Sequence, residues 1–181
     1  MKLVNKNLKK VGYFNALLIV VAIIFRLYYI GTFSPIVTVD SAVCTIALIF
    51  GLFYSLNGYK KAAAKYYKGF MYLYFVSSAL SFGSTLYIGS MSLTASGLVI
   101  ILCNLAILLL AFILSFIKDF GEKKSNSISL TILILNTIKL VLVLNTTTSN
   151  ISIGFANLML ACILCVFVSA KYIEKESRGA I

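Results

Sequence analysis

The chain has 181 residues, of which 61% are hydrophobic and only 12% are charged, and its mean hydropathy is +1.01. A soluble domain carries about 25% charged residues, so this composition excludes an ordinary soluble protein. The net charge of +11 would suggest nucleic acid as a partner in a soluble protein, but here the basic residues lie in short segments between long apolar runs. We therefore expect an integral membrane protein in contact with the lipid bilayer, and no nucleic-acid partner.

Six apolar runs follow one another along the chain, and each is long enough to cross the hydrocarbon core of a bilayer, which takes roughly 20 helical residues. The runs span about 11–30, 37–56, 69–88, 96–117, 128–144 and 152–172. Four lysines precede the first run, as in a signal peptide, but no small-residue cleavage site follows it, so we expect an uncleaved first helix. The sequence predicts an all-α integral membrane protein, with residues 1–181 forming a single transmembrane domain of six helices and no soluble domain.

The basic residues of the connecting segments fall on one side only. The N-terminal tail, the segments near 57–68 and 118–127, and the C-terminal tail together hold 14 of the 16 basic residues. The segments that alternate with them, 31–36, 89–95 and 145–151, hold no charged residue. By the positive-inside rule, both termini are cytoplasmic and the helices form three antiparallel hairpins in a plasma membrane. The excess of lysine over arginine is typical of an AT-rich bacterial genome.

Three charged residues lie inside the apolar runs, namely Arg26, Asp40 and Lys139. A charge at the centre of a bilayer costs at least about 2.5 kcal/mol, so each of them needs an explanation. The predicted orientation places all three in the outer half of the bilayer. Asparagines lie at similar depth on the fourth, fifth and sixth helices.

One interpretation is a polar pocket that opens to the outside. If Asp40 neutralises Arg26, Lys139 remains as the unpaired cation and favours an anionic ligand. Asn136 lies one helical turn from Lys139 on the same face. The predicted ligand-binding residues are Lys139, Asn136, Asn104, Asn157, Arg26 and Asp40.

The other interpretation is helix packing alone. Arg26 and Lys139 lie near enough to the membrane surface for their side chains to reach the headgroups. Arg26 and Asp40 face each other across a short hairpin, and asparagine and serine commonly join membrane helices. Small residues mark further packing faces, such as Ala47, Gly51 and Ser55 on the second helix.

No pattern indicates catalysis. The chain has no histidine, the side chain most often used as a metal ligand and acid–base group, and it shows no catalytic, phosphate-binding or metal-ligand spacing. Cys162 and Cys165 form a Cys-x-x-Cys pair, but they lie deep in the sixth run, where a thiol is inert. We expect no enzymatic activity, no catalytic residues, no metal and no cofactor.

The segment 57–69 is the longest of the predicted cytoplasmic loops. Its alanine, lysine and tyrosine content predicts a short amphipathic helix at the headgroups, with Tyr59, Tyr66 and Tyr67 at the interface and its lysines attracted to anionic lipid. The alternative is a docking site for a cytoplasmic or membrane protein partner.

The function that these features favour is binding or transport of a small, anionic solute. The alternatives are an oligomeric channel lined by Lys139 and Asn136, and a non-catalytic accessory, scaffold, defence or immunity subunit that acts through partner proteins. The size and topology resemble those of the substrate-capture subunits of energy-coupling-factor vitamin transporters. Residues 15–22 of the first helix lack the Ala-xxx-Ala spacing by which those subunits dock to their motor. The resemblance is therefore limited to chain size and membrane topology.

Overall fold

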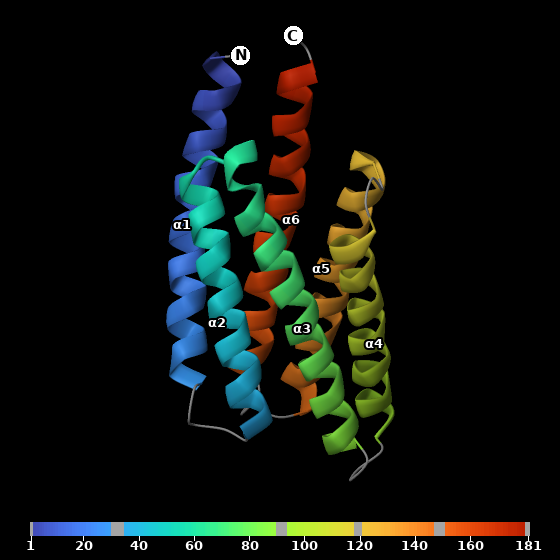
Figure 1. Cartoon of the computed structure of the whole chain (residues 1–181). Helices are drawn as coiled ribbons and strands as arrows, with labels where there is room; N and C mark the ends of the chain where they lie inside the picture. The colour runs from blue at the N-terminus through green and yellow to red at the C-terminus, as the bar shows by residue number, and fades with distance from the viewer. Residues whose placement is uncertain (1, 30–34, 90–93, 118–120, 147–150, 180–181) are drawn as a thin grey trace.

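The structure is a computed structural model, and it describes residues 2–29, 35–89, 94–117, 121–146 and 151–179. It contains six α-helices, a 3-10 turn between the second and third of them, and no strand among the described residues (Figure 1). The elements are α1 (Lys2–Tyr29), α2 (Pro35–Leu56), η1 (Lys61–Ala63), α3 (Ala64–Gly89), α4 (Ala95–Phe116), α5 (Glu122–Thr146) and α6 (Ile151–Gly179). The predicted all-α class is confirmed, while the predicted outer segments fall largely outside the described residues.

Five of the six helices, α1, α2, α4, α5 and α6, are long and apolar enough to cross a membrane. The helix α3 has 26 residues but is more polar, because serines and a threonine follow one another on it from Ser77 to Thr85. Two of these side chains, Ser77 and Ser78, are buried inside the bundle. Some of the polar side chains of α3 therefore contact neighbouring helices. With five apolar helices beside α3, the chain is a polytopic membrane protein.

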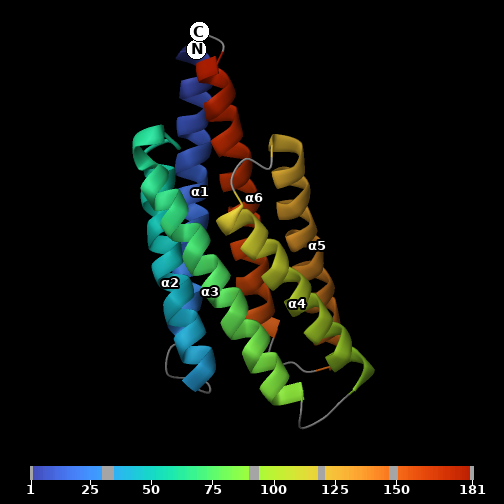
Figure 2. The ribbon, with the colours of Figure 1, turned by 45° about the vertical axis from the view of Figure 1, so that its right-hand side comes forward.

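The helices pack beside one another in chain order, and α6 closes the bundle by returning to α1 (Figures 1 and 2). Successive helices run antiparallel, so both ends of the chain lie at the same end of the bundle. At that end, α1 and α6 extend beyond the other four helices in both views.

Several helices are longer than the apolar runs predicted. The structure starts α1 at Lys2, α3 at Ala64 and α5 at Glu122, and it ends α6 at Gly179. The reason is that lysine, alanine and glutamate are good helix formers, so a helix continues where the apolar run stops. Hydropathy marks the part of a helix that suits lipid, not the end of its hydrogen-bonded backbone.

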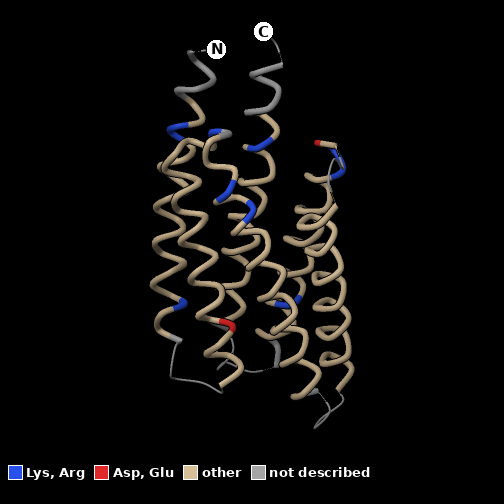
Figure 3. The backbone as a smooth tube through the Cα atoms, in the orientation of Figure 1, with Lys and Arg blue, Asp and Glu red and all other residues tan. Residues whose placement is uncertain are grey.

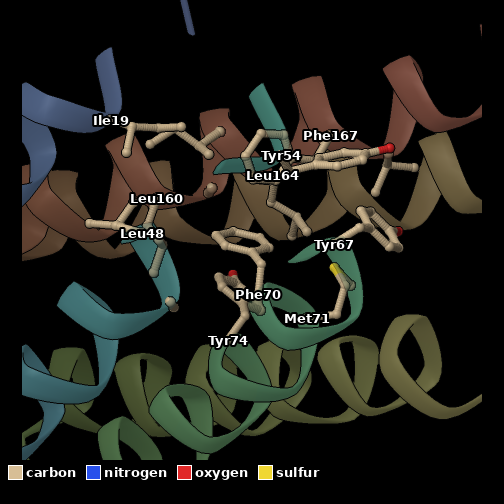
Figure 4. Packing of buried hydrophobic residues seen from close by; sticks show 14 of the residues in the cluster. Ile19, Leu48, Tyr54, Tyr67, Phe70, Met71, Tyr74, Leu160, Leu164 and Phe167 are labelled. Atoms are coloured by element: carbon tan, nitrogen blue, oxygen red, sulfur yellow. The ribbon is translucent and has the colours of Figure 1, made fainter. Parts of the chain in front are cut away.

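An aromatic cluster holds α2, α3 and α6 together (Figure 4). The ring of Phe167 on α6 lies with its centroid 4.8 Å from that of Phe70 and 5.4 Å from that of Tyr54, both edge-on. Gly51 makes room for it, since a Cβ there would lie 2.8 Å from the Phe167 ring. The predicted packing face of Ala47, Gly51 and Ser55 is indeed buried.

The turn after α2 is a Schellman motif. The amide of Gly58 donates to the carbonyl of Ser55, and the amide of Tyr59 donates to that of Tyr54. Gly58 has a φ of 62°, which favours glycine at this position. The Tyr59 ring then packs edge-on against Tyr54 at 5.1 Å between centroids, which is the apolar contact that usually accompanies this motif.

The prediction for the tyrosines of this turn was wrong for two of the three. Tyr59 is 1% exposed and Tyr67 is 9% exposed, so both belong to the core instead of the headgroup interface. Residues 57–69 also form no separate amphipathic helix, because the 3-10 turn leads directly into α3, which begins at Ala64. The lysines Lys60, Lys65 and Lys68 are exposed, as expected.

Candidate functional site

The charged residues form two groups along the bundle axis (Figure 3). One group lies near the end that holds both termini, which we call the basic end; it includes the exposed residues Lys9, Lys60 and Lys171. The second group lies in the opposite half of the bundle. It consists of Arg26, Asp40 and Lys139, which we call the buried charge cluster. None of the three side chains is classed as exposed.

Arg26 is held by contacts to two other helices. It is only 2% exposed, and its Nη1 lies 3.5 Å from Oδ2 of Asp40 on α2. Its Nη2 donates a short hydrogen bond to Oδ1 of Asn157 on α6. Its Nε is buried and has no hydrogen-bond partner among the described residues. Arg26 therefore faces inward, and it does not reach for the membrane surface.

Asp40 is the common acceptor for donors from three helices. The hydroxyl of Ser77 on α3 donates to its Oδ1 at 2.5 Å, and that of Ser81 donates to its Oδ2 at 3.4 Å. The Cys44 thiol lies 3.7 Å from the same Oδ1. With Arg26 also in contact, both carboxylate oxygens have partners, which is the condition for keeping a charge buried.

Lys139 is in a different situation. Its Nζ donates to Oδ1 of Asn104 on α4 at 2.5 Å, and the Asn104 amide donates in turn to Thr85 on α3 at 2.7 Å. Among the described residues, no carboxylate lies within ion-pair distance of Lys139. An ammonium group has three protons, so two of those on Lys139 remain for another acceptor. Lys139 is thus oriented by neutral groups and not neutralised.

These chains of hydrogen bonds surround a small cavity between α3, α4, α5 and α6, with a volume of about 20 Å³. Eight of its ten lining residues are polar, and the other two are Ile107 and Leu160. The polar ones are Tyr74, Ser77, Ser78, Ser81, Asn104, Asn136, Lys139 and Asn157. We call this space the polar cavity. None of the lining residues that the structure describes is a carboxylate.

The structure brings all six predicted site residues into one region. Lys139, Asn136, Asn104 and Asn157 line the polar cavity itself. Arg26 and Asp40 lie behind its wall and reach it through Asn157 and Ser77, respectively. That the six bind a ligand stays a prediction. Their common location is a feature of the fold.

The predicted ligand-binding residues did not include the four hydroxyl residues of the lining, namely Tyr74, Ser77, Ser78 and Ser81. All four lie on α3 at spacings of three or four residues, so they share one face of that helix. Tyr74 could not be recognised from the sequence, because a tyrosine in an apolar run is usually an ordinary core residue, and it is in fact only 4% exposed.

A second set of polar contacts joins α5 to α6 nearer the basic end. Ser125 and Tyr172 share a hydrogen bond of 2.8 Å, and Ser169 donates to Asn126 at 3.2 Å. The Cys165 thiol donates to the backbone carbonyl of Ser129 at 3.3 Å. These groups satisfy one another across the helix interface, so the packing interpretation explains them.

The polar cavity can supply hydrogen-bond donors under a positive electrostatic potential. The Asn157 amide nitrogen has no hydrogen-bond partner among the described residues, since only its oxygen is used, by Arg26. Lys139 and Asn157 thus offer donors from α5 and α6 to the same space. Within the described residues, no group of histidine, cysteine or acidic side chains could hold a metal ion. No family model, no curated protein and no solved structure matches this chain.

Proposed function

We propose that this protein binds a small anionic solute in the polar cavity and moves it across the membrane. The observation that carries the proposal is the position of Lys139, which lines the cavity and has no carboxylate partner among the described residues. A helix-packing role alone would not need a charged side chain there, because methionine or leucine would fill the same position without the cost of burying an ammonium group.

Charge balance supports an anion over a cation or a neutral solute. Arg26 and Asp40 offset each other, while Lys139 adds an uncompensated positive charge. Removing such a charge from water carries a penalty of several kcal/mol that a counter-ion offsets. A bound anion would supply that counter-ion and would accept the free protons of Lys139.

Orientation follows from the positive-inside rule. The exposed lysines of the basic end support a cytoplasmic location of both termini, and we propose that the protein lies in the plasma membrane of a bacterial cell. The polar cavity then lies in the outer half of the bilayer, so the solute would enter from outside the cell. The lysines Lys60, Lys65 and Lys68 would face the cytoplasmic headgroups and any partner protein that docks there.

The proposal is tested by comparing the purified protein with the variant Lys139→Met in detergent that contains a bulky background anion, gluconate. Chloride, nitrate, acetate and sulfate are added in turn, and the unfolding temperature is recorded. A ligand that binds the native state raises this temperature by mass action. We expect at least one anion to do so for the wild type and for the control Lys123→Met, an exposed lysine on the same helix, but not for Lys139→Met.

A second measurement addresses movement of the solute. The protein is reconstituted into liposomes, and uptake of the anion that shifted the unfolding temperature is followed with time. Uptake that depends on Lys139 supports transport. If no anion in the series separates the wild type from Lys139→Met, the proposal is wrong and the accessory-subunit alternative takes its place.

A further inference from the structure

The size of the polar cavity limits what it can hold. Its volume is about 20 Å³, whereas a space of about 10–15 Å³ admits one water molecule. Sites for organic ligands occupy roughly 300–1,000 Å³. The cavity therefore has room for a single small ion or one to two water molecules, and not for a metabolite with a carbon skeleton.

We infer that the ligand of the polar cavity is a monatomic, monovalent anion of the size of chloride, a class of solute narrower than the proposed function requires. The inference rests on that proposed function. Chloride is only slightly larger than water, so it can replace the water that such a polar space would otherwise hold. An organic carboxylate would need the side chains around it to move apart.

The donors match a spherical anion. Lys139 has two free protons and Asn157 has an unused amide nitrogen. Ser77 and Ser81 already give their protons to Asp40, and Ser78 gives its proton to the Tyr74 carbonyl. Free donors thus remain on Lys139 of α5 and Asn157 of α6, and the Tyr74 hydroxyl of α3 is a further donor of the lining. A monatomic anion can be approached by these donors from any angle, whereas each oxygen of a planar or tetrahedral oxyanion would have to meet a donor in a fixed direction.

The charge selects a monovalent ion. The buried charge cluster carries one positive charge in excess, on Lys139, once Arg26 and Asp40 are paired. One negative charge balances this excess, while sulfate would leave a buried negative charge without a partner. The second negative charge of a bound sulfate would cost free energy for the same reason as the Lys139 charge does in an empty site, because each would be buried without a counter-charge.

Two apolar side chains set the limit of size. Ile107 on α4 and Leu160 on α6 are the only apolar residues in the lining, and they are 5% and 4% exposed. Both are held by the surrounding core, so the cavity cannot widen at these two positions without repacking. Shortening one of them adds space next to Lys139 without removing a polar group.

The inference is tested by measuring the affinity of the full-length wild type for chloride, bromide, acetate and sulfate by calorimetric titration in gluconate. The variant Ile107→Ala is measured in the same way, together with the control Leu105→Ala, whose side chain is 37% exposed on the same helix. One methylene group changes discrimination in a tight pocket by about 10-fold or more. We expect the wild type and the control to prefer chloride over acetate at least about tenfold, and Ile107→Ala to lose most of that preference.

The outcomes separate the two proposals. Acetate or sulfate binding to the wild type as tightly as chloride would overturn the inference about size or charge and leave anion binding intact. A preference that Ile107→Ala leaves unchanged would overturn the location of the size limit. Failure of every anion to bind the wild type overturns the proposed function itself. If Ile107→Ala does not fold, Ile107→Val adds a smaller volume, and a smaller change in the same direction is expected.

Discussion

Lys139 on α5 donates a hydrogen bond to Asn104 on α4 across 2.5 Å, and this contact turns the only unpaired charge of the buried cluster toward the bundle interior. The two helices make fewer contacts with each other than the helices of the three hairpins do. A single charge-assisted hydrogen bond between them therefore has a large share in keeping the polar cavity closed on that side.

The first prediction concerns the energy of this contact. A double-mutant cycle of Lys139→Met and Asn104→Leu should give a coupling energy of about 1.5–3 kcal/mol, as expected for a hydrogen bond to a charged group. The measurement is unfolding by SDS in mixed micelles, followed by circular dichroism. Asn104→Leu combined with Lys123→Met, an exposed lysine, should be additive. Additivity in the first cycle would show that Lys139 does not use Asn104.

The second prediction concerns the buried ion pair. Arg26→Met leaves Asp40 charged in the bundle interior with hydroxyl and thiol donors only, so it should lower the free energy of unfolding by about 3–5 kcal/mol. Adding Asp40→Asn to the same protein should recover part of the loss. The exposed lysine variant Lys10→Met serves as the control and should change stability by less than about 0.5 kcal/mol. A double variant as unstable as the sum of the singles would contradict the pairing.

The third prediction compares two glycines in helices. A Cβ at Gly12 would lie 2.5 Å from the backbone oxygen of Ser55, whereas a Cβ at Gly83 would meet no atom within 4 Å. Gly12→Ala should therefore destabilise the α1–α2 hairpin by about 1–3 kcal/mol, because a backbone atom cannot move away. Gly83→Ala should be neutral or stabilising by up to about 1 kcal/mol. Equal effects of the two substitutions would be incompatible with the close approach of α1 and α2.

The fourth prediction concerns Tyr59, in the turn between α2 and α3. Burial raises the pKa of its phenol above the usual value, and this effect outweighs the opposite effect of the nearby Ser55 and Asn15 side chains. By geometry, its hydroxyl has no hydrogen-bond partner among the described residues. The folded state therefore keeps its proton at a pH where the unfolded chain has lost it. The contribution of Tyr59 to the free energy of unfolding is therefore fully present below the pKa of the unfolded chain, about 10, and it is lost as the pH rises above that value.

Tyr59→Phe isolates this effect. The variant should be at least as stable as the wild type at pH 7, because it removes a buried hydroxyl without a partner, and it should lose less stability between pH 9 and about 11. The unfolding temperature of both proteins across this range is the measurement, since their difference cancels the titration of the other groups. A parallel decline in both proteins would mean that the Tyr59 hydroxyl is solvated or bonded in the folded state.

The number and type of the elements could be predicted because they depend on local composition. An apolar run of sufficient length has to form a helix in a bilayer, since only a helix satisfies its own backbone there. The predicted ends of the helices were less accurate, as α5 shows, because it begins at Glu122 and the predicted run began at about 128. Helix propensity continues through the charged residues that hydropathy treats as loops.

The buried location of the tyrosines in the α2–α3 turn could not be predicted. Tyr59 and Tyr67 lie beside lysines in the sequence and so suggest the headgroup region. A positive φ at both Gly58 and Tyr59 turns the chain back over the end of α2. The Tyr59 ring then lies with its centroid 6.2 Å from that of Phe167 on α6, and the Tyr67 ring lies 5.4 Å from that of Tyr54. These contacts exist only once α2, α3 and α6 are assembled.

The sequence by itself predicted six helices of a membrane bundle and placed Arg26, Asp40 and Lys139 toward the same end of it, because position along the bundle axis follows from position along a helix of known rise. It did not determine which way each of these side chains points, since a helix that is apolar all round has no preferred face. The tertiary structure decided how each helix is rotated about its own axis. Packing between helices paired Arg26 with Asp40 and left Lys139 facing a polar cavity of about 20 Å³.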